Sequence, residues 1–356
     1  MTAQPGTARG PADGSVSRAS RTRLGRRVTL VGCALFALTA LLFVVALLLG
    51  EAGLSPAEVL EAFTGRADRV TAFVVLQLRL PRAIAAALVG VCLGVSGAVF
   101  QSVVRNPLAS PDIVGVTAGA GTAGVAGVLV FGVSGLALSI TVVAGGMLTA
   151  VVVAALTWRR GIHGMRLVLI GVGAAALATA LTSYLLTRVD VRDAHVAYTW
   201  LVGSLNGTDW PIVWVLIALA FVVLVMLGAQ RRSLRVLELG DATAAALGFR
   251  VERARIGVLL TAVVLAAVAV GTSGPIGFVA LMAPQIARRL VGRTSLSLVA
   301  SAAVGAALVS ASDLIAQYLV PTISFPVGVV TGVIGAPYLA WLLAGSRTRS
   351  RSGGSS

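Results

Sequence analysis

Apolar residues form ten long runs along the chain, separated by short polar connections. A helix needs roughly 20 apolar residues to cross the hydrocarbon core of a bilayer, and most of the runs are close to that length. The pattern therefore predicts an all-α, polytopic membrane protein with about ten transmembrane helices, at residues 28–49, 83–104, 113–133, 136–156, 167–186, 212–227, 256–271, 276–290, 296–315 and 327–344.

The eighth run, at 276–290, is the weakest of these spans. Pro284, Gln285, Arg288 and Arg289 interrupt it, so we expect a helix that is short or lies partly outside the lipid. Without this span, every segment after it would have the opposite orientation.

The composition supports a membrane protein. Of 356 residues, 57% are hydrophobic and 12% are charged, and a soluble domain of this composition would expose large apolar patches. The net charge of +15 does not indicate nucleic-acid binding, because the arginines lie in the connections rather than on one basic face. If the N-terminus is cytoplasmic, the inner segments hold 22 arginines and the outer ones six, as the positive-inside rule requires. Both termini are therefore predicted to be cytoplasmic, in a multi-pass protein of the plasma (inner) membrane.

The 28 basic residues are all arginine, so the chain cannot build a P-loop, whose lysine contacts the nucleotide phosphates. Any ATP that the protein uses must be hydrolysed by a partner. Cys33 and Cys92 lie within apolar runs, where we expect them to pack rather than to bind metal.

Four segments lie outside the spans: two tails, one outer segment and one inner segment. Residues 1–27 are predicted to be a disordered cytoplasmic tail, 28–345 the transmembrane domain and 346–356 a second cytoplasmic tail. Residues 55–63 predict a short amphipathic helix on the outer membrane surface, with Ser55 as its N-cap. The inner segment 238–250 is too short and polar to span, and we expect an exposed helix that Asp241 caps and Gly248 ends.

Three stretches resemble the permeases of ferric-siderophore, haem and cobalamin ABC importers, in matching order and spacing. The first begins at Arg79-Leu80-Pro81-Arg82 and ends in Arg105-Asn106-Pro107-Leu108-Ala109-Ser110-Pro111-Asp112. The second joins Leu247-Gly248 to Gly274-Pro275-Ile276-Gly277-Phe278-Val279. The third joins Asp313 to Phe325-Pro326-Val327-Gly328. In addition, Trp200-Leu201-Val202-Gly203-Ser204-Leu205-Asn206-Gly207 resembles permeases of the ferric enterobactin type.

The resemblance implies partners and a substrate. It implies two ATPase subunits that bind ATP and Mg²⁺, a second permease chain, identical or different, and an extracytoplasmic substrate-binding protein. The chain itself would be no enzyme and would hold no cofactor or metal. Its substrate would be a ferric siderophore, with haem or cobalamin as the alternative.

The resemblance also implies three groups of site residues. Arg79 and Arg82 would dock acidic groups of the binding protein, although both could instead snorkel to lipid headgroups, and Gln317 stands where relatives have a third docking arginine. The Asn106-Pro107 pair predicts a turn that ends the second span. The resemblance implies that Asn106 and Leu108, opposite Gly164 and Met165, form a cytoplasmic gate there. Segment 238–250 would contact the ATPase, through Asp241, Ala244, Ala245, Leu247 and Gly248.

Two other classes of function were weighed. A secondary transporter would need carboxylates or histidines deep in the membrane, but the spans offer only Asp313, near an outer end, where it could cap a helix. Gly94-Val95-Ser96-Gly97 resembles the nucleophile motif of an intramembrane protease. A serine nucleophile needs a base within hydrogen-bond reach, and both histidines, His163 and His195, lie in loops. Ser96 is therefore expected to be a packing residue.

Overall fold

The computed structural model describes residues 13–50, 53–157, 164–292, 297–320 and 324–351, and every element within them is a helix. The helices are α1 (Asp13–Leu48), α2 (Pro56–Thr64), α3 (Arg69–Phe73), η1 (Val74–Arg79), α4 (Leu80–Val104), α5 (Val116–Leu129), α6 (Gly135–Thr157), α7 (Gly164–Leu186), α8 (Val191–Leu201), α9 (Trp210–Ala229), α10 (Arg231–Glu238), α11 (Asp241–Ala246), α12 (Val251–Ser273), α13 (Val279–Val291), α14 (Leu298–Tyr318) and α15 (Val327–Arg351).

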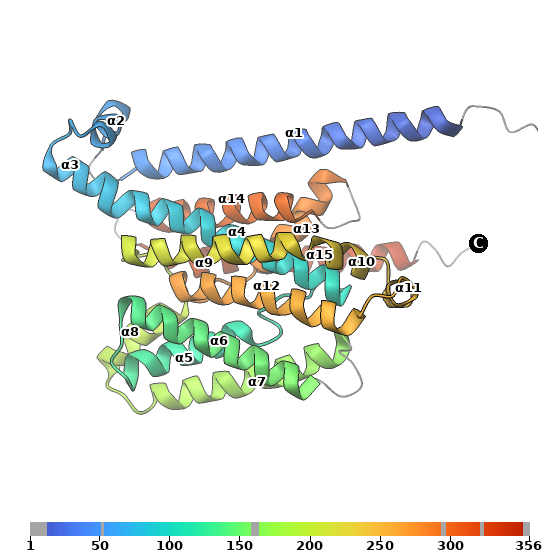
Figure 1. Ribbon diagram of the computed structural model, residues 1–356. Coiled ribbons are helices and arrows are strands. Elements are labelled where there is room, and N and C mark those ends of the chain that lie inside the picture. The colour runs from blue at the N-terminus through green and yellow to red at the C-terminus, as the bar shows by residue number, and fades with distance from the viewer. Residues whose placement is uncertain (1–12, 51–52, 158–163, 293–296, 321–323, 352–356) are drawn as a thin grey trace, which may run out of the picture.

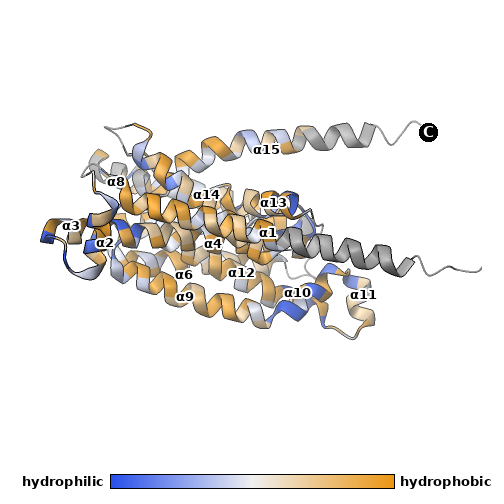
Figure 2. Cartoon of the chain, turned by 90° about the horizontal axis from the view of Figure 1, so that it is seen from above, coloured by the Kyte–Doolittle hydropathy of each residue, from blue (hydrophilic) through white to orange (hydrophobic). Residues whose placement is uncertain are grey.

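The long helices lie side by side in one bundle with two distinct ends (Figure 1). Helices α2, α3 and α8 lie at one end, which we call the outer end. Helices α10 and α11 lie at the opposite, inner end, together with the start of α1 and the end of α15. Hydrophilic residues gather at α2 and α3 and at α10, whereas the bodies of the long helices are mainly hydrophobic (Figure 2).

Seven helices of the described chain are long and apolar enough to cross a membrane: Thr29–Leu48, Arg69–Val104, Gly135–Thr157, Arg166–Leu186, Trp210–Ala229, Val251–Ser273 and Leu298–Tyr318. Val116–Leu129 and Val327–Leu342 are shorter apolar helices. The remaining predicted span is α13, which contains Pro284 and ends in two arginines. All-α architecture and a multi-pass chain are thus confirmed, while the number of crossings stays a prediction.

The second span differs from its prediction at its outer end. It was expected to begin at residue 83, but a continuous helical segment runs from Arg69 to Val104 and includes the π-helical turn η1. Pro81 explains this turn, because its nitrogen cannot donate to a carbonyl one turn earlier and its ring crowds that position. The backbone N–H of Leu80 instead donates to the carbonyl of Val75, five residues back.

The structure describes part of each predicted tail as helix. Residues 13–27 form the first turns of α1, and α15 continues to Arg351, past the predicted boundary at 345. Arginine is a good helix former, and a helix that has already started extends at little cost into polar sequence. Residues 1–12 lie outside the described part of the chain.

Helix α4 occupies the centre of the bundle. Most of its residues are buried, and it packs against α14, α12 and α13. Close contact with α14 depends on glycine, because a Cβ at Gly90 would lie 2.3 Å from the carbonyl oxygen of Gly305. The small-residue faces that the sequence contains at Gly90 and Gly94 are therefore used within this chain.

The outer helix α2 has the predicted cap. The Ser55 side chain accepts from the backbone N–H of Glu58, and the Glu58 carboxylate accepts from the backbone N–H of Ser55 at 2.7 Å. Val59 and Ala62 are buried against Leu47 and Val75, so α2 packs on the outer ends of α1 and η1.

Candidate functional site

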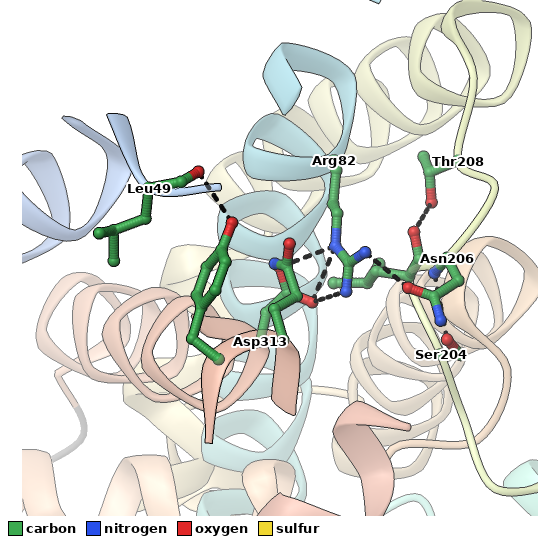
Figure 3. Close-up of polar contacts among 9 residues, drawn as sticks. Leu49, Arg82, Ser204, Asn206, Thr208 and Asp313 are labelled. Carbon is green, nitrogen blue, oxygen red and sulfur yellow. Dashed lines mark hydrogen bonds and ion pairs between the residues drawn. The ribbon is translucent and has the colours of Figure 1, made fainter. Parts of the chain in front are cut away.

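The outer end holds a polar cluster around Arg82, which we call the outer cluster: Arg82, Asn206, Asp313 and Gln317. The Arg82 guanidinium donates to both carboxylate oxygens of Asp313, with the shortest contact at 2.8 Å, and to the Asn206 side-chain oxygen at 2.5 Å (Figure 3). The Gln317 amide donates to Asp313 at 2.7 Å. The cluster thus joins α4 and α14 to the loop that connects α8 with α9.

The ion pair of Arg82 with Asp313 is largely buried, although it lies at the outer end of the bundle. The Asp313 side chain is 3% exposed and that of Arg82 is 18% exposed. A buried carboxylate is tolerated only with a close charge partner and filled hydrogen bonds, both of which Arg82 and Gln317 supply. The expectation that Asp313 caps a helix is therefore wrong, because its partners are side chains.

Arg79 is also engaged inside the chain. Its guanidinium donates to the carbonyls of Leu47 at 2.7 Å and Leu48 at 3.2 Å, which are among the last carbonyls of α1. These carbonyls have no partner within their own helix, so Arg79 acts as a C-terminal cap. Arg79 and Arg82 thus lie near each other on one helical segment, and each binds an acceptor of this chain.

At the inner end, α4 runs into the loop that contains the predicted gate. Asn106 bends this loop, because its side-chain oxygen accepts from the backbone N–H of Leu108 at 2.9 Å. The Asn–Pro turn was predicted, and such side-chain bonds are the usual means by which asparagine forms one. Both side chains are half-buried. Gly164 and Met165, which were expected to face them across the gate, form the start of α7. The surroundings of both residues lie outside the described structure.

The carbonyl of the gate loop's Pro107 is held by a buried pair of glutamines. Gln285 of α13 donates to this carbonyl at 2.6 Å and to the side-chain oxygen of Gln101 at 3.1 Å. Arg288 also donates to Gln101. Gln285 thus serves as an interior hydrogen-bonding group, and its partners fix α13 to the inner end of α4.

A second charged cluster, which we call the inner cluster, joins the gate loop to segment 238–250: Arg105, Asp241, Glu252 and Arg255. Asp241 binds Arg105 and Arg255, each at 2.7 Å, and Arg255 also binds Glu252 at 3.0 Å. Hydrogen bonding from Arg255 is the largest cause that holds the pKa of the Asp241 carboxyl below its usual value. Asp241 is therefore ionised at neutral pH.

Segment 238–250 contains the predicted exposed helix, with one difference at its start. Helix α11 runs from Asp241 to Ala246, and Gly248 follows it with a φ of 76°, the left-handed turn that was predicted. Asp241 was expected to cap this helix, but the cap position is Gly240, and no side chain caps the helix. The Asp241 carboxylate is instead bound by the two arginines.

The two faces of α11 differ in exposure. Ala244 is fully buried against the bundle, whereas Ala245 and Gly248 are exposed and the Leu247 side chain is 61% exposed. A leucine this exposed outside the apolar helix bodies leaves a hydrophobic surface without a partner in the described chain.

Four residues of the two clusters were not expected there from the sequence: Asn206, Arg105, Glu252 and Arg255. A usable signal existed for the charged pairs, since Arg82 and Asp313 were placed on the outer side of the membrane, and Arg105 and Asp241 on the inner side. Opposite charges at one membrane depth are expected to pair. The sequence alone does not reveal which spans are neighbours.

The protease alternative has no support in the described residues. Ser96 is fully buried and donates to the carbonyl of Ala262 at 2.6 Å, as a packing serine does. His163 lies outside the described residues, and His195 belongs to α8 at the outer end.

Comparison with known proteins gives a consistent result. The model of the FecCD transport family matches residues 38–345. The ferric enterobactin transport system permease protein FepG of Escherichia coli strain K12 is 42% identical over 302 residues, which cover 83% of this chain and 89% of FepG. The probable siderophore transport system permease protein YfhA of Bacillus subtilis strain 168 is 35% identical and covers 92% of this chain and 97% of its own length.

A solved structure has the same fold. It is described as a metal-chelate type ABC transporter in an inward-facing conformation, with a TM-score of 0.77 and 29% identity over 89% of this chain and 99% of that one. Together with the apolar helices and the two polar clusters, these matches show that the chain is a multi-pass membrane protein that belongs to the FecCD transport family.

Proposed function

We propose that this chain is the transmembrane permease subunit of an ATP-binding cassette importer that brings a ferric siderophore across the inner membrane. Its match to the family over residues 38–345 is the observation that carries the proposal. Relatives named as permeases of ferric chelates support the substrate class. The chain itself is no enzyme, because ATP and Mg²⁺ are bound by a separate ATPase.

The proposed assembly has two permease chains, two ATPases and a binding protein on the outer side. Each permease chain crosses the membrane ten times and has both termini in the cytoplasm. The arrangement in Figure 1 supports this, because the start of α1 and the end of α15 lie on the side of α10 and α11.

Transport in proteoliposomes tests the proposal directly. The chain would be reconstituted with its ATPase, its second permease chain and its binding protein. Uptake of ferric enterobactin, a ferric hydroxamate, haem and cobalamin would then be measured. We expect ATP-dependent uptake of a ferric siderophore. Uptake that needs an ion gradient but no ATP would indicate a secondary transporter and would refute the proposal.

For the outer cluster we propose a role in docking the binding protein. Arg82 is neutralised by Asp313, so an acidic group of the binding protein would have to share the guanidinium. Asp313→Asn replaces the carboxylate that binds Arg82 with a neutral amide, so the net charge of the cluster becomes more positive. Arg82→Gln removes the positive charge beside Asp313, so the net charge of the cluster becomes more negative.

We therefore expect the binding protein to dock more tightly to Asp313→Asn than to wild type at low salt, and more weakly to Arg82→Gln. Binding to proteoliposomes at low and moderate salt measures both effects. Equal affinities for the two variants would exclude the outer cluster as a docking site.

At the inner end, we propose that Asn106 and Leu108 line the gate together with Gly164 and Met165. The exposed residues Ala245, Leu247 and Gly248 would contact the ATPase, with Ala244 behind them on the buried side of α11. Asp241, at the start of the helix, is half exposed and bound to Arg105 and Arg255. The half-buried gate side chains and the exposed Leu247 support this division. A bulky thiol adduct on a cysteine at position 108 should block iron release, and uptake at the wild-type rate after modification would remove Leu108 from the gate.

A further inference from the structure

The end of α4 and the start of α11 are far apart in sequence but are joined by several polar bonds. Arg105, the residue that ends α4, donates to Asp241 at 2.7 Å and to the carbonyl of Leu237 at 2.9 Å. One turn earlier, Ser102 donates to Glu238 at 3.3 Å. The partners Leu237 and Glu238 lie just before the short helix α11, and Asp241 is its first residue. These bonds therefore attach one face of α4 to the segment that carries Leu247.

Arg105 has a backbone conformation that non-glycine residues rarely adopt. Its φ is 54° and its ψ is 36°, the left-handed region, and in the described chain only Phe278 shares a positive φ among non-glycine residues. This conformation ends α4 and turns the chain into Asn106 and the gate loop. A side chain in such a conformation persists only where surrounding contacts hold it. Here those contacts are Asp241 and the Leu237 carbonyl.

Asp241 is itself fixed from the other side. Both of its carboxylate oxygens accept from the Arg255 guanidinium, at 2.8 and 2.7 Å, and the side chain of Arg255 is 9% exposed on α12. The pair of Asp241 with Arg105 is about half exposed, so it adds little to the stability of the chain. The pair instead fixes the position of the Arg105 side chain relative to α11, so a displacement of α11 would also displace Arg105.

We propose that Asp241 is a positioning residue that transmits movement of α11 to the cytoplasmic gate through Arg105. The inference rests on the proposed function, in which α11 contacts the ATPase and residues 106–108 line the gate. A shift of α11 draws the Arg105 guanidinium with it and rotates the strained turn that precedes Asn106. The hydrogen bond of Gln285 to the Pro107 carbonyl holds the far side of the same loop, so the movement is concentrated between residues 105 and 107.

Four variants separate this link from other roles. Asp241→Asn removes the charge that binds Arg105. Arg105→Gly removes the guanidinium but adopts a left-handed conformation without strain, so it keeps the turn and loses the link. Glu252→Gln is the matched control, because it also removes a carboxylate that binds Arg255, at 3.0 Å and three residues away on α12. Asp241→Glu tests whether a carboxylate rescues function.

Each variant would be made in a chain with Cys33→Ser, Cys92→Ser and Leu108→Cys, and purified with the ATPase and the second permease chain. We would measure ATPase co-purification, ATP hydrolysis stimulated by the binding protein, and thiol labelling at position 108 with and without ATP. Iron uptake per ATP hydrolysed would be measured in the same chains without Leu108→Cys.

Asp241→Asn and Arg105→Gly should assemble with the ATPase and hydrolyse ATP, but uptake per ATP should fall about tenfold, a typical size for coupling between sites. The change in labelling between the two nucleotide states should disappear. Glu252→Gln should differ from wild type by less than about twofold, and Asp241→Glu should recover most of the coupling.

Two results would overturn the proposal. One is labelling at position 108 that still responds to ATP in both variants. The other is an ATPase that no longer co-purifies with Asp241→Asn, since Asp241 would then serve assembly. The labelling assay needs no siderophore, so an error in the proposed substrate would appear separately, as absent iron uptake by the wild-type complex.

Discussion

At the scale of single residues, the two clusters place charge where the membrane makes it expensive. Arg82 and Asp313 lie on two buried helices at the outer end, and each makes the other tolerable there. Removing water from both ions costs several kcal/mol per ion, an energy that only close contact and filled hydrogen bonds recover. Arg82 therefore has a structural role in addition to any part in docking.

Arg82→Gln should consequently destabilise the permease, because it leaves Asp313 buried without a counter-charge. We expect a loss of about 3 kcal/mol. The double variant Arg82→Gln with Asp313→Asn should recover most of that loss, since no buried charge remains. Unfolding of the purified chain in mixed detergent micelles measures both. A single variant as stable as wild type would mean that the ion pair does not stabilise the fold.

Leu247→Asp tests the exposed face of α11. If Leu247 is buried against the ATPase, the aspartate introduces an unpaired charge there, and we expect a cost of about 2 kcal/mol, or roughly 30-fold weaker association. Co-purification of the ATPase and its stimulated hydrolysis would be measured, with Leu247→Met as the apolar control. Full assembly of the aspartate variant would exclude Leu247 from the interface.

The sequence located the site residues better than their contacts. Asn106 and Gly248 have the predicted turns because these depend on neighbours in the chain. The partner of Arg82 is Asp313, 231 positions away in the sequence. The partners of Asp241 are Arg105, 136 positions away, and Arg255, 14 positions away. Such pairs follow from helix packing, which a single sequence does not specify.

At the scale of helices, α4 shows how small residues determine packing. A Cβ added at three of its glycines would collide with a backbone oxygen of a neighbouring helix. The distances would be 2.3 Å from Gly90 to Gly305, 2.3 Å from Gly94 to Ser301 and 1.7 Å from Gly97 to Ala280. In lipid, helices associate through such close backbone approach rather than through the hydrophobic effect. The position of α14 against α4, and with it the contact between Asp313 and Arg82, depends on Gly90 and Gly94.

Gly90→Ala should therefore push α14 away from α4. Because the obstructing atoms belong to the backbone, the clash is not relieved by a side-chain rotation, and we expect a loss of about 2 kcal/mol. Gly332→Ala is the matched control, since no atom lies within 4 Å of its added Cβ, and alanine favours a helix. Equal stability of the two variants would contradict tight packing at Gly90.

The pattern of apolar runs predicted the existence of the long helices but not their ends. Hydropathy reports the length of chain that lipid covers, whereas a helix continues until its backbone geometry changes. Helix α1 therefore extends back to Asp13 through arginine-rich sequence, and the second span extends outward to Arg69 through a π-helical turn that Pro81 explains.

At the scale of the whole molecule, orientation depends on one short helix. The chain is arranged with α2, α3 and α8 at the outer end and with the start of α1 and the end of α15 at the other. That arrangement requires α13 to cross the membrane, although it has 13 residues and contains Pro284. If α13 did not cross, everything after it would be inverted and the C-terminus would lie outside.

Cysteine accessibility decides between these topologies. In a chain with Cys33→Ser and Cys92→Ser, single cysteines would replace three exposed leucines, Leu60 of α2, Leu247 after α11 and Leu319 after α14, which are 66%, 61% and 66% exposed. Whole spheroplasts would be treated with a membrane-impermeant maleimide and compared with lysed ones. Ten crossings predict labelling of positions 60 and 319 from outside and of position 247 only after lysis. Position 319 is decisive, because it moves to the cytoplasmic side if α13 remains on one face, whereas positions 60 and 247 keep their sides. Labelling of position 319 only after lysis, with position 60 still labelled from outside, would therefore show that α13 does not cross.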